Sequence, residues 1–300
     1  MAALVEDRRS QVCLGIDPDP GGLPDTAGGG PSGVEAAERA ADAIARWSRE
    51  LIERAGPACV AAKPQLACFE RLGAPGWRAL RDTVDAAREA GLLVIADGKR
   101  GDVPVSAAAY AQALVGETPT PWGAVPGLGA DAFTVNPLLG ADALEPFVDA
   151  AAGSGAGVFA LVRTSNPGAR DLLDVPTDAG PVHERIAALV AGVADRLAGD
   201  RGLTGMGAVV GATEPRFLAR LRALMPGAIF LVPGVGAQGG RADDLGPALG
   251  AHPASVLVAA SRSIAAAENP LAAAEALREE AWALAPERPP GGGTITRRST

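Results

Sequence analysis

Eight short apolar runs, each of strand length, recur along this 300-residue chain. Patterns of helical spacing lie between them, as where Ile186, Val190 and Val193 recur on one helical face. Strands that are apolar throughout are buried on both sides, which is typical of a parallel sheet covered by its crossover helices. The runs are residues 12–16, 59–62, 92–96, 132–135, 158–162, 208–210, 229–232 and 256–259.

Eight strand–helix units predict an α/β protein with a closed (β/α)8, or TIM, barrel. A doubly wound open sheet fits the same periodicity, but no Gly-x-Gly-x-x-Gly sequence follows the first strand. We therefore expect one barrel domain over residues 1–285. The Pro/Gly-rich residues 286–300 cannot bury a core, and we expect a disordered tail there. Residues 116–129, also rich in Pro and Gly, are expected to form a long loop before the fourth strand.

The composition narrows the possible functions and partners. The formal net charge of −8 argues against a nucleic-acid-binding surface, although a few local cations can still bind an anionic substrate. No apolar stretch approaches the ~20 residues that span a bilayer, so we expect a cytoplasmic protein without membrane contact. Cys13, Cys59 and Cys68 lack metal-ligand spacing and are expected to be structural. His183 and His252 are expected at the surface.

Polar side chains follow nearly every predicted strand. In a barrel the carboxyl ends of the strands meet at one rim, where the chemistry of this fold takes place. Any barrel would show one or two such residues, whereas a nearly complete set indicates an active site. The residues are Asp17, Lys63, Asp97 with Lys99 and Asp102, Asn136, Thr164 with Ser165, Thr213, Gln238 and Arg262.

Lysine is rare in this chain: among 27 basic residues only Lys63 and Lys99 are lysines. Arginine keeps its proton, whereas a lysine in a tuned site can donate it. Lys99 stands between Asp97 and Asp102, and nearby negative charge keeps an ammonium protonated. The spacing of Asp97 and Lys99 places both side chains on one face of a strand. We expect Lys99 to be a proton donor and electrostatic stabiliser; an exposed salt-bridge cluster is the alternative.

A glycine-rich segment follows the seventh predicted strand, and Ser261 and Arg262 follow the eighth. Glycines let backbone N–H groups approach an anion, and these two loops form the usual phosphate site of a (β/α)8 barrel. Arg262 would add a bidentate cation. We therefore expect a phosphate site that includes Gly236, Gly239, Gly240 and Arg262. No residues have the spacing of metal ligands, so no metal site is expected.

Several segments, in this order along the chain, resemble the motifs of the orotidine 5'-phosphate decarboxylase family, most closely its bacterial type 2 subfamily. The resemblance extends from about residue 11 to 275, which is almost the whole chain. The matching segments are Cys13-Leu14-Gly15-Ile16-Asp17-Pro18, Lys63-Pro64-Gln65, Asp97-Gly98-Lys99-Arg100-Gly101-Asp102, Arg163-Thr164-Ser165-Asn166-Pro167-Gly168, Val232-Pro233-Gly234-Val235-Gly236-Ala237-Gln238-Gly239-Gly240 and Ser261-Arg262.

The resemblance implies a (β/α)8 homodimer that converts orotidine 5'-phosphate to UMP and CO2 in pyrimidine biosynthesis, without a metal or an organic cofactor. It implies that Lys63, Asp97, Lys99 and Asp102 form a charged catalytic network. Lys99 would stabilise a carbanion at C6 of the pyrimidine and then protonate it. Asp102 would reach into the site of the partner subunit.

The resemblance also implies substrate contacts. Asp17 would bind the ribose, Ser165 the pyrimidine, and Gln238 together with Arg262 the phosphate. Ser106 would reach into the partner's site. A threonine is expected at that position in the family, so the hydroxyl is kept while a methyl group is lost.

Two alternatives remain open. One is a sugar-phosphate decarboxylase or aldolase of the same superfamily, which would use magnesium. Lys63 argues against it, because those relatives carry an acidic residue at the end of the second strand. The other is a non-catalytic nucleotide-binding barrel. In such a barrel we would expect one or more of Asp97, Lys99 and Asp102 to be substituted, and the sequence keeps all three.

Overall fold

The computed structural model of the chain describes residues 1–23, 33–212, 215–235 and 242–285. Eight parallel strands close into a barrel in the order β1-β12-β11-β10-β7-β6-β3-β2, so the predicted (β/α)8 fold is confirmed. The barrel strands are β1 (Val12–Ile16), β2 (Ala61–Pro64), β3 (Leu93–Arg100), β6 (Ala132–Val135), β7 (Gly157–Arg163), β10 (Thr204–Val210), β11 (Ala228–Pro233) and β12 (Val256–Ala260).

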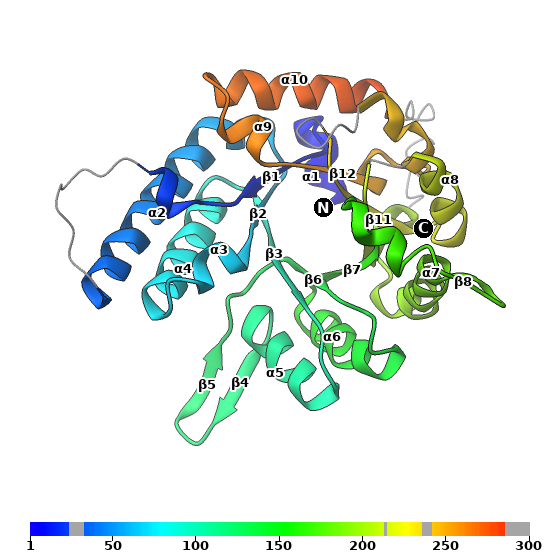
Figure 1. Cartoon of the computed structure of the whole chain (residues 1–300), viewed down its shortest axis with the longest axis horizontal. Helices are drawn as coiled ribbons and strands as arrows, with labels where there is room; N and C mark the ends of the chain where they lie inside the picture. Colours follow the sequence, from blue (N-terminus) through cyan, green and yellow to red (C-terminus); the bar gives the residue numbers. More distant parts are fainter. Residues whose placement is uncertain (24–32, 213–214, 236–241, 286–300) are drawn as a thin grey trace, which may run out of the picture.

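Helices surround the strands and separate them along the chain, as Figure 1 shows. Most of them lie on the outside of the barrel; α2, for example, is amphipathic and buries Ile44, Leu51 and Ile52 against it. The helices are α1 (Ala2–Arg8), α2 (Val34–Ala55), α3 (Leu66–Glu70), α4 (Ala74–Glu89), α5 (Pro104–Leu114), α6 (Ala141–Ser154), α7 (Val182–Val193), α8 (Pro215–Leu224), α9 (Arg262–Ala265) and α10 (Pro270–Ala283). Among the described residues, no helix is both long and apolar enough to span a bilayer.

The core has two layers, one outside the strands and one within the barrel. The outer layer packs alternate strand residues such as Leu14 and Phe133 against the helices. The inner layer holds Phe159, Leu257 and Val5. Val5 is fully buried although it belongs to α1, which precedes the first strand. This helix covers the amino-terminal end of the barrel, so the opposite end is left for ligands.

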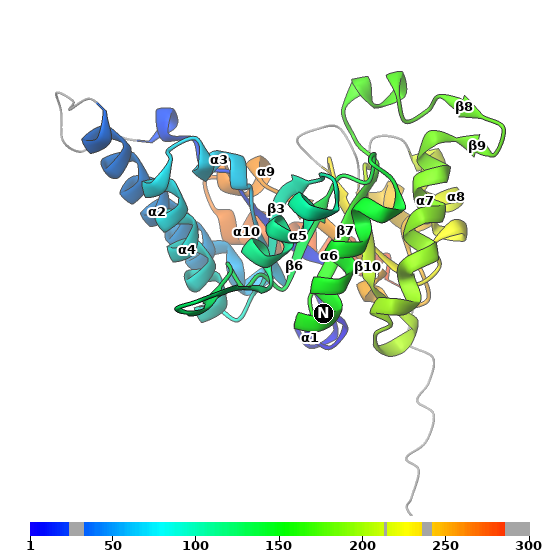
Figure 2. The ribbon, with the colours of Figure 1, turned by 90° about the horizontal axis from the view of Figure 1, so that it is seen from below.

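Figure 2 shows α1 at the lower end of the barrel and a short hairpin, β8 (Pro176–Thr177) with β9 (Gly180–Pro181), at the upper end. The hairpin belongs to the connection from β7 to α7, which begins where β7 ends. The upper end is therefore the rim formed by the carboxyl ends of the strands.

The prediction of a long loop at residues 116–129 is wrong. This stretch contains an antiparallel hairpin of β4 (Glu117–Thr120) and β5 (Gly123–Pro126), which projects from the barrel beside α5 in Figure 1. The hydroxyl of Thr120 donates a hydrogen bond to Gly123 O across the turn, over 2.7 Å. Both strands are largely exposed, and Trp122 at the tip is 93% exposed. Two exposed strands carry no apolar run, so the sequence pattern could not reveal them.

Candidate active site

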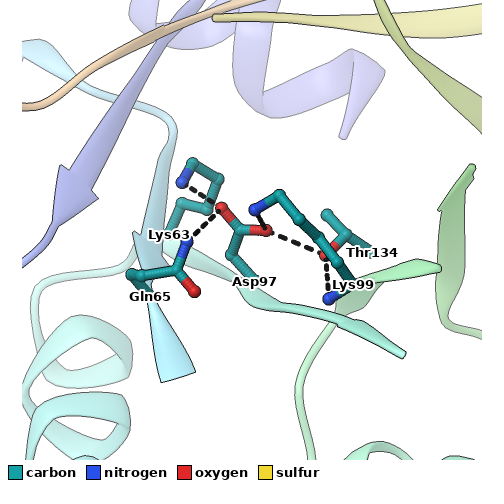
Figure 3. Close-up of polar contacts among 5 residues, drawn as sticks. All are labelled: Lys63, Gln65, Asp97, Lys99 and Thr134. Atoms are coloured by element: carbon teal, nitrogen blue, oxygen red, sulfur yellow. Dashed lines mark hydrogen bonds and ion pairs between the residues drawn. The ribbon is translucent and has the colours of Figure 1, made fainter. Parts of the chain in front are cut away.

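One carboxylate at the barrel mouth accepts hydrogen bonds from both lysines. Lys63 Nζ in β2 donates to Asp97 Oδ2 over 2.5 Å, and Lys99 Nζ donates to Asp97 Oδ1 over the same distance. Figure 3 shows the Asp97 carboxylate between the two ammonium groups. Strands β2 and β3 are neighbours in the barrel, and this brings Lys63 to Asp97 across 34 positions of sequence. Asp97 is thus the centre of a charged cluster.

Two uncharged side chains also bind the Asp97 carboxylate. Gln65 Nε2 donates to Oδ2 over 3.3 Å, and the hydroxyl of Thr134, in β6, donates to Oδ1 over 2.9 Å. Neither belongs to the site residues predicted from the sequence. Thr134 had a signal: it is the one polar residue in the strand Ala132–Val135. A buried polar residue inside an apolar strand needs a partner, and here that partner is Asp97.

Burial and charge act in opposite directions on the two buried groups. Lys63 and Asp97 are only 9% and 4% exposed. Burial disfavours the Lys63 ammonium, but the nearby carboxylates of Asp97 and Asp17 outweigh burial and raise the pKa of Lys63. Burial likewise disfavours an ionised Asp97, yet Lys63 and Lys99 lower the pKa of Asp97 to about 2. At neutral pH Asp97 is therefore a carboxylate and Lys63 an ammonium.

Lys99 lies at a kink in β3, with a left-handed backbone φ of 47°. A non-glycine residue in this region is strained and needs support from its surroundings. Its backbone N–H donates to Thr134 Oγ1 over 2.9 Å, and the register between β3 and β6 shifts at this point. Lys99 therefore departs from the regular strand geometry predicted from its spacing. Its side chain is 42% exposed and reaches Asp97 from the open side of the cluster.

A cavity of about 180 Å³ adjoins this cluster on the side of β1, β11 and β12. The backbones come close there because Gly15 has no side chain: a Cβ at Gly15 would lie 2.7 Å from Ser261 Cβ. Arg262 begins α9 at the edge of the cavity and is exposed. The lining residues are Gly15, Asp17, Lys63, Pro233, Gly234, Val235, Ala259, Ala260, Ser261, Arg262 and Ser263. The cavity therefore joins the predicted ribose and phosphate residues to the charged cluster.

Several predicted site residues lie outside the described residues or away from the cluster. Thr213, Gln238 and the glycines Gly236, Gly239 and Gly240 are among the residues that are not described. Ser165 is described; it follows β7 and is half-buried.

Asp102 and Ser106 follow β3 but do not join the cluster within this chain. Asp102 Oδ1 accepts a hydrogen bond from the backbone N–H of Val103 over 2.8 Å, while the Lys99 ammonium pairs with Asp97. Ser106 lies in α5 and is half-buried. Among the described contacts within one chain, Lys99 therefore pairs with Asp97 and not with Asp102, and the expected role of Asp102 in the partner's site stays a prediction.

Histidine, cysteine and acidic side chains can also bind metal ions or act as nucleophiles. Within the described ranges, no three His, Cys, Asp or Glu side chains are grouped as a metal site would need. Cys13 and Cys59 are free and buried, and burial raises the pKa of the Cys13 thiol to about 12. Cys68 is also free. His183 is only 2% exposed, so its expected surface position is wrong.

The arrangement can stabilise negative charge and deliver a proton. Lys99 is the accessible member of the cluster, whereas Lys63 is buried against Asp97. An anion that develops beside Lys99 would meet a positioned ammonium in a partly dry site, where such a charge acts strongly. Arg262 offers another cation, at the edge of the adjoining cavity. A ligand with one reacting anionic group and one remote anionic group would match both.

Comparisons with known proteins agree on one family. Residues 10–277 match the family described as orotidine 5'-phosphate decarboxylase / HUMPS. The orotidine 5'-phosphate decarboxylase of Deinococcus radiodurans is 42% identical over 258 residues, which cover 86% of this chain and 84% of that protein. The enzyme of the same name from Rhodopirellula baltica is 40% identical, covering 91% and 89%. The structure of Leishmania donovani OMP decarboxylase has a TM-score of 0.71 at 34% identity, covering 94% and 97%.

Proposed function

The chain belongs to the orotidine 5'-phosphate decarboxylase family, and we propose that its barrel mouth converts orotidine 5'-phosphate to UMP and CO2 in pyrimidine biosynthesis. One observation carries the assignment of the site. The Asp97 carboxylate lies between the ammonium groups of Lys63 and Lys99, each at 2.5 Å, and Lys99 is the exposed one of the pair. The narrower assignment to the bacterial type 2 subfamily stays a prediction.

The reaction breaks the bond between C6 of the pyrimidine and its carboxyl carbon. CO2 leaves, and the bonding electron pair stays on C6. The Lys99 ammonium stabilises this developing carbanion and then gives C6 a proton, and the resulting amine recovers a proton from solvent. Lys63 is suited to a different role: it keeps the Asp97 carboxylate ionised, because their charges are in contact in a buried place. Like charge between Asp97 and the departing carboxylate is relieved as CO2 leaves.

Binding energy comes from groups remote from C6. We propose that Arg262, with Gln238 and the glycines Gly236, Gly239 and Gly240, holds the phosphate and that Asp17 binds the ribose. The cavity supports these roles for Asp17 and Arg262, because both residues line it. Lys63 also lines it and belongs to the charged cluster. A phosphate held away from the reacting carbon helps to order the site for the chemical step.

We propose that the second carboxylate beside Lys99 is Asp102 of the partner subunit in a homodimer, with Ser106 nearby. In its own chain Asp102 binds only the Val103 backbone among the contacts described, and it is followed by the exposed apolar side chains of Val103 and Val105. Apolar surface of this kind is suited to burial between subunits. The negative net charge supports an enzyme without a nucleic-acid partner, and a cytoplasmic location without a membrane partner stays a prediction.

The proposal is tested by following the loss of orotidine 5'-phosphate absorbance with purified protein in the presence of EDTA. We expect turnover that added magnesium does not increase. Turnover of a keto-sugar phosphate only with magnesium, and none of orotidine 5'-phosphate, would instead support a sugar-phosphate enzyme. Tight UMP binding without turnover of either compound would support a nucleotide-binding barrel that has lost its chemistry.

A further inference from the structure

The connection between β7 and α7 carries Ser165 at its beginning and the β8–β9 hairpin near its end. Ser165 itself lies in no helix or strand, and contacts made by its neighbours help to fix its backbone position. The residue two positions before it, Arg163, is the last residue of β7 and is only 5% exposed. A buried arginine needs partners for its guanidinium, and these partners lie within the same connection.

The Arg163 guanidinium makes three hydrogen bonds to this connection. Nε and Nη2 donate to the two carboxylate oxygens of Asp174 over 2.8 and 3.0 Å, and Nη1 donates to Thr164 O over 2.5 Å. Thr164 O belongs to the peptide group that joins Thr164 to Ser165. Arg163 therefore holds this peptide group directly while its paired carboxylate, eleven residues later, closes the connection into a loop. A bidentate pair also fixes the plane of the guanidinium.

The far end of the loop is fastened beside the same carboxylate. The backbone N–H of His183 donates to Leu173 O over 2.9 Å, and His183 Nδ1 lies 2.7 Å from that oxygen and 3.3 Å from Asp174 Oδ1. The Phe217 ring of α8 packs against the buried His183 ring at 4.8 Å and under the Arg163 guanidinium at 5.0 Å. Asp174 is thus held in place to receive Arg163.

The opposite side of Ser165 rests on the neighbouring strand. Gly211 directly follows β10, and its N–H donates to Arg163 O over 2.8 Å. A Cβ on Gly211 would lie 2.7 Å from both Cα and Cβ of Ser165, so the backbones touch at this point. Ser165 is therefore confined between the Gly211 backbone and the peptide group that Arg163 holds.

We propose that Arg163 is a positioning residue for Ser165: with Asp174 it fixes the Thr164–Ser165 peptide group so that the Ser165 side chain faces the pyrimidine. This inference rests on the proposed function, in which Ser165 contacts the substrate. Arg163 does not itself touch the substrate. Its contribution passes through Ser165, and this distinguishes it from an arginine that merely stabilises the fold.

A double-mutant cycle on kcat/KM for orotidine 5'-phosphate tests the inference. Arg163→Lys keeps the charge but cannot reproduce the three-bond fork, and we expect it to lower kcat/KM about ten- to a hundredfold, since small displacements of a site group have such effects. In a Ser165→Ala background the same change should cost less than about twofold, because the group it positions is gone. Equal losses in both backgrounds would overturn the inference.

Arg220→Lys is the matched control. Arg220 also forms a bidentate pair, with Glu184 of α7 over 3.0 and 2.7 Å, but it is exposed, and its described hydrogen bonds go to Glu184 and not to the Thr164–Ser165 peptide group. We expect its kcat/KM to equal that of the wild type. If Arg220→Lys lowered kcat/KM as much as Arg163→Lys does, the effect of Arg163→Lys would not be specific to the Thr164–Ser165 peptide group. That result would overturn the inference.

Asp174→Asn provides a second route in case Arg163→Lys does not fold. It keeps the shape and one acceptor but loses the bidentate charge pair, and we expect a smaller loss of kcat/KM that again disappears in the Ser165→Ala background. Activity equal to wild type in a folded Asp174→Asn protein would sink the inference while the proposed function stands. An inert wild-type protein would instead remove the proposed function itself.

Discussion

Replacing Asp97 with asparagine removes the charge that both lysines share and keeps nearly the same shape. Folding lowers the pKa of Asp97 from 3.8 to about 2. This difference corresponds to about 2–3 kcal/mol of stability at neutral pH, because each pKa unit is worth about 1.4 kcal/mol. Removing one partner of a buried ion pair costs a similar amount, about 3–5 kcal/mol, since the other charge stays buried. We therefore expect Asp97→Asn to lower the free energy of unfolding by about 3 kcal/mol.

The pH dependence of this loss follows from the direction of the pKa shift. A carboxyl group whose pKa is lowered by folding adds stability that is present above its unfolded pKa and is lost as the pH falls through its folded pKa. For Asp97 that window runs from about 4 down to about 2. The stability difference between the wild type and Asp97→Asn should be constant near neutral pH and should shrink across this window.

Urea unfolding, followed by tryptophan fluorescence at pH 7 and at steps down to pH 3, measures the difference. Glu89→Gln is the control, because Glu89 forms a 2.8 Å pair with Arg49 on the exposed surface, and such pairs contribute about 0.5 kcal/mol or less. Asp97→Asn with wild-type stability at pH 7 would show that the buried ion pairs of Asp97 do not stabilise the fold. A stability difference between the wild type and Asp97→Asn that is the same at pH 3 as at pH 7 would show that the Asp97 charge is not its cause.

Three further predictions concern the proposed site. Arg262→Ala should raise KM for orotidine 5'-phosphate about tenfold or more and change kcat less, because it removes a charged hydrogen-bond donor from the phosphate; steady-state kinetics with an unchanged KM would contradict this. Lys99→Ala and Asp102→Ala subunits, each inactive alone, should regain up to about a quarter of wild-type activity after equal mixing, because each mixed dimer holds one intact site. No recovery despite proven subunit exchange would exclude a shared site. Gly211→Ala should lower kcat/KM about tenfold or more, because the new Cβ, 2.7 Å from Ser165 Cα, displaces that residue; wild-type kinetics in a folded variant would show that Ser165 tolerates the shift.

The barrel was predictable from the sequence because its strands are buried on both faces. Every one of the eight apolar runs corresponds to a barrel strand, with ends that differ by a few residues. The neighbouring positions of β2 and β3 then bring Lys63 to Asp97. The β4–β5 hairpin was missed because its strands are exposed and carry no periodic signal.

Other features of the site depend on contacts that sequence spacing does not encode. The left-handed kink at Lys99 is supported by Thr134, a residue from another strand. The burial of His183 results from packing against Phe217 in α8. The spacing of residues along one strand predicts the face on which a side chain lies. Its orientation in the folded protein also depends on contacts with other strands.

In the proposed reaction the Lys99 ammonium stabilises the carbanion and then protonates it. The most direct test compares kcat for orotidine 5'-phosphate in the wild type and in Lys99→Ala, with UMP affinity measured in parallel by calorimetry. We predict a loss of kcat of at least about 10³-fold, with UMP bound within a few-fold of the wild-type affinity. A Lys99→Ala protein that turns over substrate at a rate near that of the wild type would contradict the account.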